Sequence, residues 1–319
     1  MLFRSAKHGI FCIDELPVLD PRKQVALLSV LQEGRYTTGS YPVIFEPKTV
    51  FFATANPIDY THSGKIIEPL YDRLKSHIQT HYPKTIEDEM QIILQEAKTA
   101  NCLIPIFVLK TLARLVHNAR ANPDINQAKG VSVRFGIHGL ELVVGESERT
   151  RAITHKKIPV PRISDMYCLG QIAKFELSEI DDTIENRRKI FEIMLGDSIK
   201  ETCLDYVREL TEANFDSIKQ EFSGKTLQVS QAMIWQNNQI SYSSQLAQFP
   251  KLSELVNLKL EQITLEQANL VNIVPINNLI PEQNSKDELK AAILELLLDA
   301  MYYMTPKIVD KKETGYVAV

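Results

Sequence analysis

Long apolar runs and grouped cysteines are both missing from this sequence. No stretch of its 319 residues reaches the roughly 18 consecutive apolar residues that a membrane-spanning helix needs. Residues 1–8 also lack the apolar core of a secretory signal. The four cysteines are scattered singly, without the spacing of a zinc site, a haem attachment or a redox dithiol. We therefore expect a cytoplasmic protein with no membrane span and with reduced thiols.

An excess of positive charge is missing as well. The 36 basic residues stand against 40 acidic ones, which gives a formal charge of −4. Because domains that bind nucleic acid usually carry a basic surface, we expect no nucleic-acid partner. The seven histidines form no His-Glu-x-x-His or comparable pair, so the sequence gives no sign of a zinc hydrolase site.

Residues 9–15, Gly-Ile-Phe-Cys-Ile-Asp-Glu, join an apolar run to two carboxylates. This pattern predicts a fully buried strand that ends at the carboxyl edge of a sheet, where open α/β folds bind ligands. At that edge Asp14 could hold Mg²⁺ through water, and Glu15 could take a proton from a water that attacks a phosphate. The alternative is a buried strand that ends in two solvated acids.

The elements that follow predict the rest of an α/β domain. Asp20-Pro21 is a good helix start, and the helix is expected over residues 21–33 with Val25, Leu28 and Leu31 on its apolar face. Residues 36–47 alternate and turn, which predicts a β-hairpin. Residues 48–55 read as a second buried strand and residues 76–82 as a third.

The remainder of the sequence is mainly helical. Helices are expected over residues 87–99, 106–122, 136–148, 162–177, 182–211, 246–267 and 286–303, with a shorter one that ends near residue 222 and a brief strand over 226–229. Residues 306–319 look frayed. We predict an α/β core over residues 1–83, an α-helical lid over 84–181 and a mainly helical extension over 182–319.

Asn56 follows the second predicted strand, beside the point where the two acids emerge. An uncharged amide there can orient an attacking water or contact a terminal phosphate. The alternative is a cap for the turn before Pro57.

Two arginines have the positions that phosphoryl-transfer chemistry would use. Arg73, in Leu-Tyr-Asp-Arg-Leu, could reach into a neighbouring subunit and stabilise charge on a phosphoryl group, or it could form a surface ion pair with Asp72. Arg134, in Val-Ser-Val-Arg-Phe, could fold over a bound nucleotide, or it could be a solvated arginine at a helix end.

The order of these pieces resembles the AAA+ ATPases, and within them the MoxR and magnesium chelatase ATPase-subunit group. The resemblance covers residues 2–177, with 10–15 similar to Walker B, 53–57 to sensor 1, 69–74 to the arginine-finger segment and the hairpin to the pre-sensor-1 insertion. It implies a partial P-loop-type parallel sheet, ATP and Mg²⁺ as cofactors, a ring of AAA+ subunits such as a hexamer, and ATP hydrolysis that remodels a protein partner. The site residues it implies are Asp14 for Mg²⁺ through water, Glu15, Asn56 and Arg73 for catalysis, and Arg134 as sensor 2 for ATP.

The sequence departs from this family in its phosphate-binding loop. Gly-x-x-x-x-Gly-Lys-Ser/Thr should precede Walker B, where the chain has eight residues before Gly9. Gly224-Lys225-Thr226 does not replace it, because Lys219 stands where the first glycine is needed and a helix precedes it. We therefore expect the carboxyl-side portion of a longer ATPase, inactive alone.

Two other functions stay open. The chain could be a non-catalytic regulatory or assembly module that lends Arg73 or its hairpin to a complete ATPase. It could also be an enhancer-binding transcription activator, which shares the AAA+ core. The acidic balance and the absence of a basic cluster in residues 286–303 argue against an activator.

Overall fold

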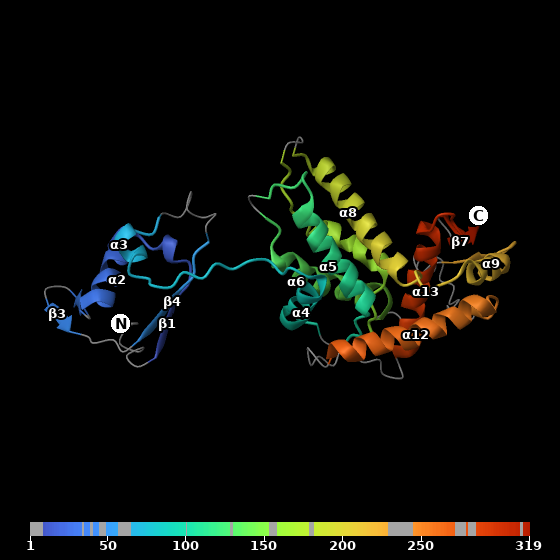
Figure 1. The fold of residues 1–319 in the computed structure, drawn as a ribbon, viewed down its shortest axis with the longest axis horizontal. Coiled ribbons are helices and arrows are strands. Elements are labelled where there is room, and N and C mark those ends of the chain that lie inside the picture. The colour runs from blue at the N-terminus through green and yellow to red at the C-terminus, as the bar shows by residue number, and fades with distance from the viewer. Residues whose placement is uncertain are drawn as a thin grey trace. The chain divides into compact units, whose positions relative to one another are not determined.

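The structure is a computed structural model that forms two compact units, Met1–His81 and Tyr82–Val319 (Figure 1). We describe each unit by itself. The residues described are 9–33, 35–38, 41–44, 49–56, 65–99, 101–127, 130–152, 158–178, 182–228, 245–271, 279, 285–312 and 315–319.

The first unit is built around two parallel strands. β1 (Ile10–Ile13) pairs with β4 (Val50–Ala53), so that Ile10 lies opposite Val50 and Ile13 opposite Ala53. Parallel strands need a crossover connection, and α2 (Pro21–Glu33) lies within it. β2 (Arg35–Thr38) and β3 (Tyr41–Ile44) form the predicted antiparallel hairpin, also within the connection. The two strands, the helix and the hairpin are thus confirmed.

The prediction that both strands are fully buried is wrong. Side chains along β1 alternate between exposed and half-buried. Ile10 is 65% exposed, Val50 57% and Phe52 55%, and all three belong to one face of the small sheet. Phe11 and Ile13 belong to the other face, where Ile13 packs on the core of this unit. Full burial requires elements on both faces, and the residues described here cover one.

The helix α2 begins as predicted, and of its three expected apolar residues Leu31 packs on the core and Leu28 is half-buried, but Val25 is not buried. The Asp20 carboxylate accepts from the backbone N–H of Arg22 at 2.9 Å and of Lys23 at 3.1 Å, which is an N-cap. Val25 is 52% exposed, whereas Leu27 is buried against Leu16 and Leu70.

A short helix, α3 (Glu68–Tyr71), follows, and Leu70 fixes it to this core. The third predicted strand is wrong, because residues 74–83 belong to neither a helix nor a strand. Ile78 is 86% exposed, as expected for an extended segment without a strand to pair with.

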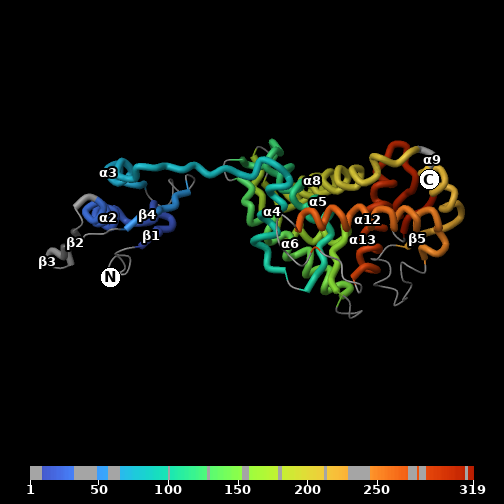
Figure 2. The backbone as a smooth tube through the Cα atoms, turned by 60° about the horizontal axis from the view of Figure 1, so that its bottom comes forward, coloured from blue at the N-terminus to red at the C-terminus, as the bar shows by residue number. Residues whose placement is uncertain are grey.

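The second unit is mainly helical, as predicted. Its longer helices are α4 (Ile86–Glu96), α5 (Ile106–Ala121), α6 (Val133–Ser147), α8 (Ile184–Asp205), α9 (Glu212–Glu221), α12 (Pro250–Val271) and α13 (Lys286–Tyr303). A π-helical turn, η3 (Glu148–Ala152), continues α6, and the helix expected over 162–177 is a shorter 3₁₀ segment, η4 (Ile163–Gln171). α5 packs along α8, and α13 packs across α12 (Figures 1 and 2).

One hydrophobic core runs through this unit, from α4 to the end of the chain. The frayed tail predicted for residues 306–319 is wrong. β6 (Val309–Lys312) and β7 (Gly315–Ala318) pair antiparallel, and β5 (Thr226–Leu227) extends the sheet on β7. Tyr316 is 1% exposed, and its hydroxyl donates to Asp299 of α13 at 2.6 Å.

Buried ion pairs join η4 to α13 within the same core. The Arg162 guanidinium is 3% exposed and lies 3.0 Å from both Glu288 and Glu295. The Ser164 hydroxyl donates to the other oxygen of Glu295 at 2.8 Å. Residues 84–181 and 182–319 therefore share one core, and their division into a lid and an extension stays a prediction. No helix among the described residues has the length and apolar character to cross a membrane.

Candidate functional site

The register of β1 and β4 brings the predicted site residues to one edge. Asp14 follows β1 directly and Thr54 follows β4 directly, so the pairing of Ile13 with Ala53 places them side by side. The Thr54 hydroxyl donates a short hydrogen bond to Oδ1 of Asp14. Among the described residues, Oδ2 of Asp14 accepts no hydrogen bond, which leaves it open to solvent or to a ligand.

Thr54 also holds the second acid. Its hydroxyl oxygen accepts from the backbone N–H of Glu15 at 3.0 Å, and its carbonyl oxygen accepts from the N–H of Leu16 at 2.9 Å. One threonine thus connects the end of β4 to both acids. Sequence reasoning did not assign Thr54 a role, although its place directly after a strand, like that of Asp14, was a usable signal.

Glu15 has a backbone conformation that most residues avoid. Its φ is 52° and its ψ 53°, in the left-handed region. For a residue other than glycine this conformation costs about 1–2 kcal/mol, and such strain concentrates at functional sites. The conformation turns the chain sharply into the 3₁₀ segment η1 (Leu16–Val18) and leaves the Glu15 side chain exposed.

Asn56 lies two residues beyond Thr54, exposed and at the same edge as Asp14. Asp14, Glu15 and Asn56 therefore all follow the carboxyl ends of two paired parallel strands, which is the placement that the sequence pattern predicted. Their catalytic roles stay predictions. Pro57, which the capping alternative for Asn56 involves, lies outside the described residues.

Arg73 sits in the turn that ends α3, within the same unit. Its backbone N–H donates to the Leu70 carbonyl at 3.1 Å, and its side chain is exposed. The described residues contain no ion pair between Arg73 and Asp72, so the alternative reading of this arginine as half of a surface pair has no support. An exposed guanidinium on a fixed turn can contact a second molecule.

Arg134 belongs to the second unit, in the first turn of α6, and is exposed. The Ser132 hydroxyl caps this helix by accepting from the Arg134 backbone N–H at 3.2 Å. The Arg120 Nε–H donates to the Val131 carbonyl at 3.0 Å. The other nitrogens of Arg120 reach both oxygens of buried Glu89 at 2.6 and 3.1 Å.

The start of α6 is therefore fixed by a buried bidentate ion pair. Tyr82 adds to this cluster, because the Arg120 guanidinium carbon lies 4.2 Å from the centre of its ring. A role of Arg134 as sensor 2 stays a prediction.

The residues at the sheet edge fit a magnesium ion that is bound mostly through water. Among the described residues no group of three or more His, Cys, Asp or Glu side chains could ligate a metal. Mg²⁺ usually keeps several waters and uses one or two carboxylates together with phosphate oxygens, so a single open oxygen of Asp14 is compatible with it.

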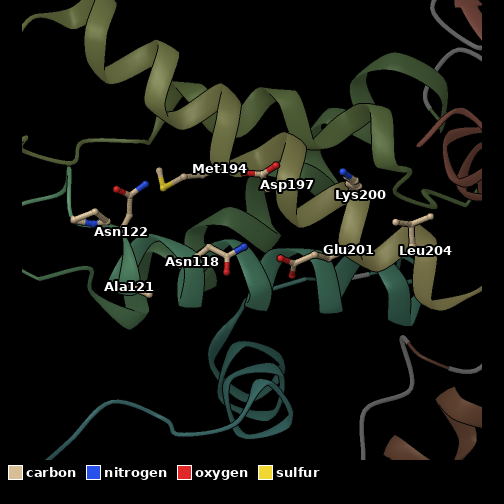
Figure 3. Close-up of a pocket in the computed structure, with 9 residues that line it drawn as sticks. Asn118, Ala121, Asn122, Met194, Asp197, Lys200, Glu201 and Leu204 are labelled. Carbon is tan, nitrogen blue, oxygen red and sulfur yellow. The ribbon is translucent and has the colours of Figure 1, made fainter. Parts of the chain in front are cut away.

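The second unit also contains a groove among its helices. It occupies about 430 Å³ between α5 and α8, and in Figure 3 the amides of Asn118 and Asn122 lie across from Met194, Asp197 and Glu201. Its lining mixes both signs of charge with apolar atoms, and none of the five predicted residues takes part.

Comparisons with known proteins bear on the first unit. Residues 2–79 match the model of the Sigma-54 interaction domain, which belongs to the AAA+ ATPases. This part of the chain is similar to AAA+ ATPase modules. A stretch of 123 residues, 37% of the chain, is 28% identical to the uncharacterized protein YeaC of Bacillus subtilis (strain 168). The match spans 38% of that relative's length.

Proposed function

We propose that the chain is part of an Mg²⁺-dependent AAA+ ATPase of the MoxR or magnesium chelatase ATPase-subunit group, which remodels a protein partner. One observation carries this proposal. The parallel pairing of β1 with β4 gathers two carboxylates and an amide at one sheet edge, and Thr54 hydrogen-bonds both to the Asp14 carboxylate and to the Glu15 backbone.

Each residue has a distinct task in this proposal. Asp14 would hold the water shell of Mg²⁺, which shields the phosphate charge when bound. Glu15 would take the proton of the attacking water, and Asn56 would orient that water. Arg73 would act on the neighbouring subunit of a ring, and Arg134 would contact the nucleotide of its own subunit.

The 319 residues contain no Gly-x-x-x-x-Gly-Lys-Ser/Thr loop, which shapes the test. We expect the purified chain to release no phosphate from ATP above background. Mixed with an intact AAA+ ATPase of this group, it should change that protein's turnover. Ordinary turnover by the chain alone would contradict the proposal, since the phosphate loop would then be dispensable.

Two variants distinguish a chain that takes part in catalysis with its own acids from a non-catalytic module that only lends Arg73. If the chain's own acids work, Glu15→Gln lowers turnover of the mixture. If the chain only lends Arg73, then Arg73→Ala removes the effect by about a hundredfold or more, while Glu15→Gln leaves it unchanged. Lys23→Gln, an exposed change on α2, serves as the control.

A second candidate function is favoured by the match to the Sigma-54 interaction domain. In that case the first unit would contact transcription machinery instead of a protein to be remodelled. The acidic balance of the chain and its lack of a basic cluster in residues 286–303 speak against direct DNA binding. Co-purification of the full chain with sigma-54 would favour this candidate, and transcription unaffected by the chain would exclude it.

A further inference from the structure

A buried amide connects the acid-bearing strand to the segment that carries Arg73. Gln24, on α2, is 1% exposed. Its Nε2 donates to the carbonyl oxygens of Leu19 at 2.8 Å and Lys65 at 3.1 Å. Its Oε1 accepts from the backbone N–H of Ile67 at 2.8 Å. Two of these partners lie 41 and 43 residues away in the sequence.

On one side the amide leads to Arg73 through backbone hydrogen bonds. Ile67 is the N-cap of α3, and its carbonyl accepts from the N–H groups of Leu70 at 2.9 Å and Tyr71 at 3.1 Å. The carbonyl of Leu70 in turn accepts from the N–H of Arg73 at 3.1 Å. The backbone of Arg73 is thus three hydrogen bonds from Gln24, by way of Ile67 and Leu70.

On the other side the amide leads to the acids. Leu19 closes the 3₁₀ segment that follows Glu15, with its N–H donating to Leu16 at 3.2 Å. The N–H of Leu16 donates to Thr54, which also holds Asp14. Gln24 is therefore hydrogen-bonded both to Leu19, in the segment that follows the acids, and to residues 65 and 67, in the segment that carries Arg73.

Glutamine is well suited to this place. It donates twice and accepts once, which matches two carbonyls and one N–H. Leucine would fill similar space but would remove the hydrogen-bond partner of three partly buried backbone groups, and glutamate would lose both donors.

We propose that Gln24 is a positioning residue that fixes the Arg73 segment relative to Asp14 and Glu15. Arg73, which would contact a neighbouring subunit, is then held at a fixed position relative to Asp14 and Glu15 of its own subunit. The functional part of this inference rests on the proposed ATPase function, whereas the structural part does not.

Hydrogen exchange on the full chain tests the structural part. Gln24→Leu should speed exchange in residues 65–74 by about tenfold or more, because the N–H of Ile67 loses its acceptor. Exchange in α2 and in the second unit should stay unchanged, which shows that the variant folds. Gln24→Glu, which keeps an acceptor for Ile67 but sets a carboxylate oxygen against the carbonyls of Leu19 and Lys65, should also speed exchange in residues 65–74. Lys23→Gln should leave exchange there unchanged.

A double variant tests the functional part in the mixture with an intact ATPase. Gln24→Leu should lower the chain's effect on turnover by about tenfold or more, in the direction of Arg73→Ala. Gln24→Leu combined with Arg73→Ala should be no worse than Arg73→Ala alone. A merely structural residue would add its own loss to the double variant.

The outcomes distinguish the inference from the proposed function. Unchanged exchange in residues 65–74 overturns the inference. The inference is also overturned if the Gln24→Leu chain still changes the turnover of the intact ATPase fully, while the Arg73→Ala chain no longer does. If Arg73→Ala itself has no effect, the proposed role of Arg73 fails, while faster exchange in Gln24→Leu still supports the structural link.

Discussion

The two compact units treat their charged side chains differently. In Met1–His81, the side chains of Asp14, Glu15 and Arg73 are exposed, next to a small buried cluster. In Tyr82–Val319, Arg162 and Glu295 are buried and paired inside one large core. An exposed charge costs little desolvation energy and is available to a ligand, whereas a buried charge must be paired. The exposed Asp14, Glu15 and Arg73 are therefore candidates for function, and the buried pair of Arg162 with Glu295 is a candidate for stability.

The largest effect should come from breaking the buried network. Arg162→Met leaves Glu288 and Glu295 without a shared counter-charge, so the second unit should lose about 3–5 kcal/mol of unfolding free energy. Calorimetry combined with hydrogen exchange would assign the loss to the second unit. Arg188→Ala, which breaks an exposed pair with Glu192, should change stability by less than about 0.5 kcal/mol. If the first unit lost as much protection against hydrogen exchange as the second, the contrast between the two units would be contradicted.

The next largest difference expected between the two units is in the reactivity of their thiols. Cys12 is exposed on the open face of the first sheet, whereas burial raises the pKa of Cys102 to about 11 and that of Cys168 to about 12. Burial also raises the pKa of Cys203. Because the thiolate is the reactive form, iodoacetamide at pH 8 should label Cys12 about a hundredfold faster or more. Peptide mass spectrometry would measure this, and equal rates for all four would contradict it.

Local sequence patterns predicted the elements that depend on near neighbours. The helix α13 has the bounds expected for it, residues 286–303, because no proline or glycine interrupts this stretch of good helix formers. The edge that gathers Asp14 and Asn56 also followed from pattern, since the carboxyl ends of adjacent parallel strands meet.

Features that depend on distant partners were not predictable in this way. The tail folds into β6 and β7 because Tyr316 reaches Asp299 on another element. Residues 76–82 have strand-like composition, but a strand forms only beside another strand, and these residues form neither a helix nor a strand. The role of Gln24 could not be predicted for the same reason, since its hydrogen bonds to Lys65 and Ile67 form only when the chain folds.

Acid should weaken the second unit through a carboxylate pair on its helices. Burial alone would raise the pKa of Asp205, but the hydrogen bond and charge of Arg114, with Lys110, hold it below its ordinary value. The pair therefore contributes stability above the unfolded pKa near 3.8 and loses it as pH falls through the lower folded pKa.

Asp205→Asn should cost about 1–2 kcal/mol at pH 7, and this difference should shrink toward zero below about pH 3. Urea unfolding at several pH values measures it. Glu185→Gln, at an exposed pair with Lys189, should follow the wild-type profile. A difference that persists at low pH would contradict the role of the charged pair.

The smallest expected effect is a gain in stability, and it concerns the first unit. Glu15 pays for a left-handed backbone that glycine adopts freely, so Glu15→Gly should stabilise this unit by about 0.5 kcal/mol. Asp72→Gly, at an ordinary helical conformation, should instead destabilise it by about 0.5–1 kcal/mol. Urea unfolding followed by hydrogen exchange of residues 9–33 would compare the two. A gain in stability on removing Glu15 means that the fold does not require this side chain, which leaves chemistry as the reason for a carboxylate there. A loss equal to that of Asp72→Gly would instead make Glu15 a structural residue like those of the second unit.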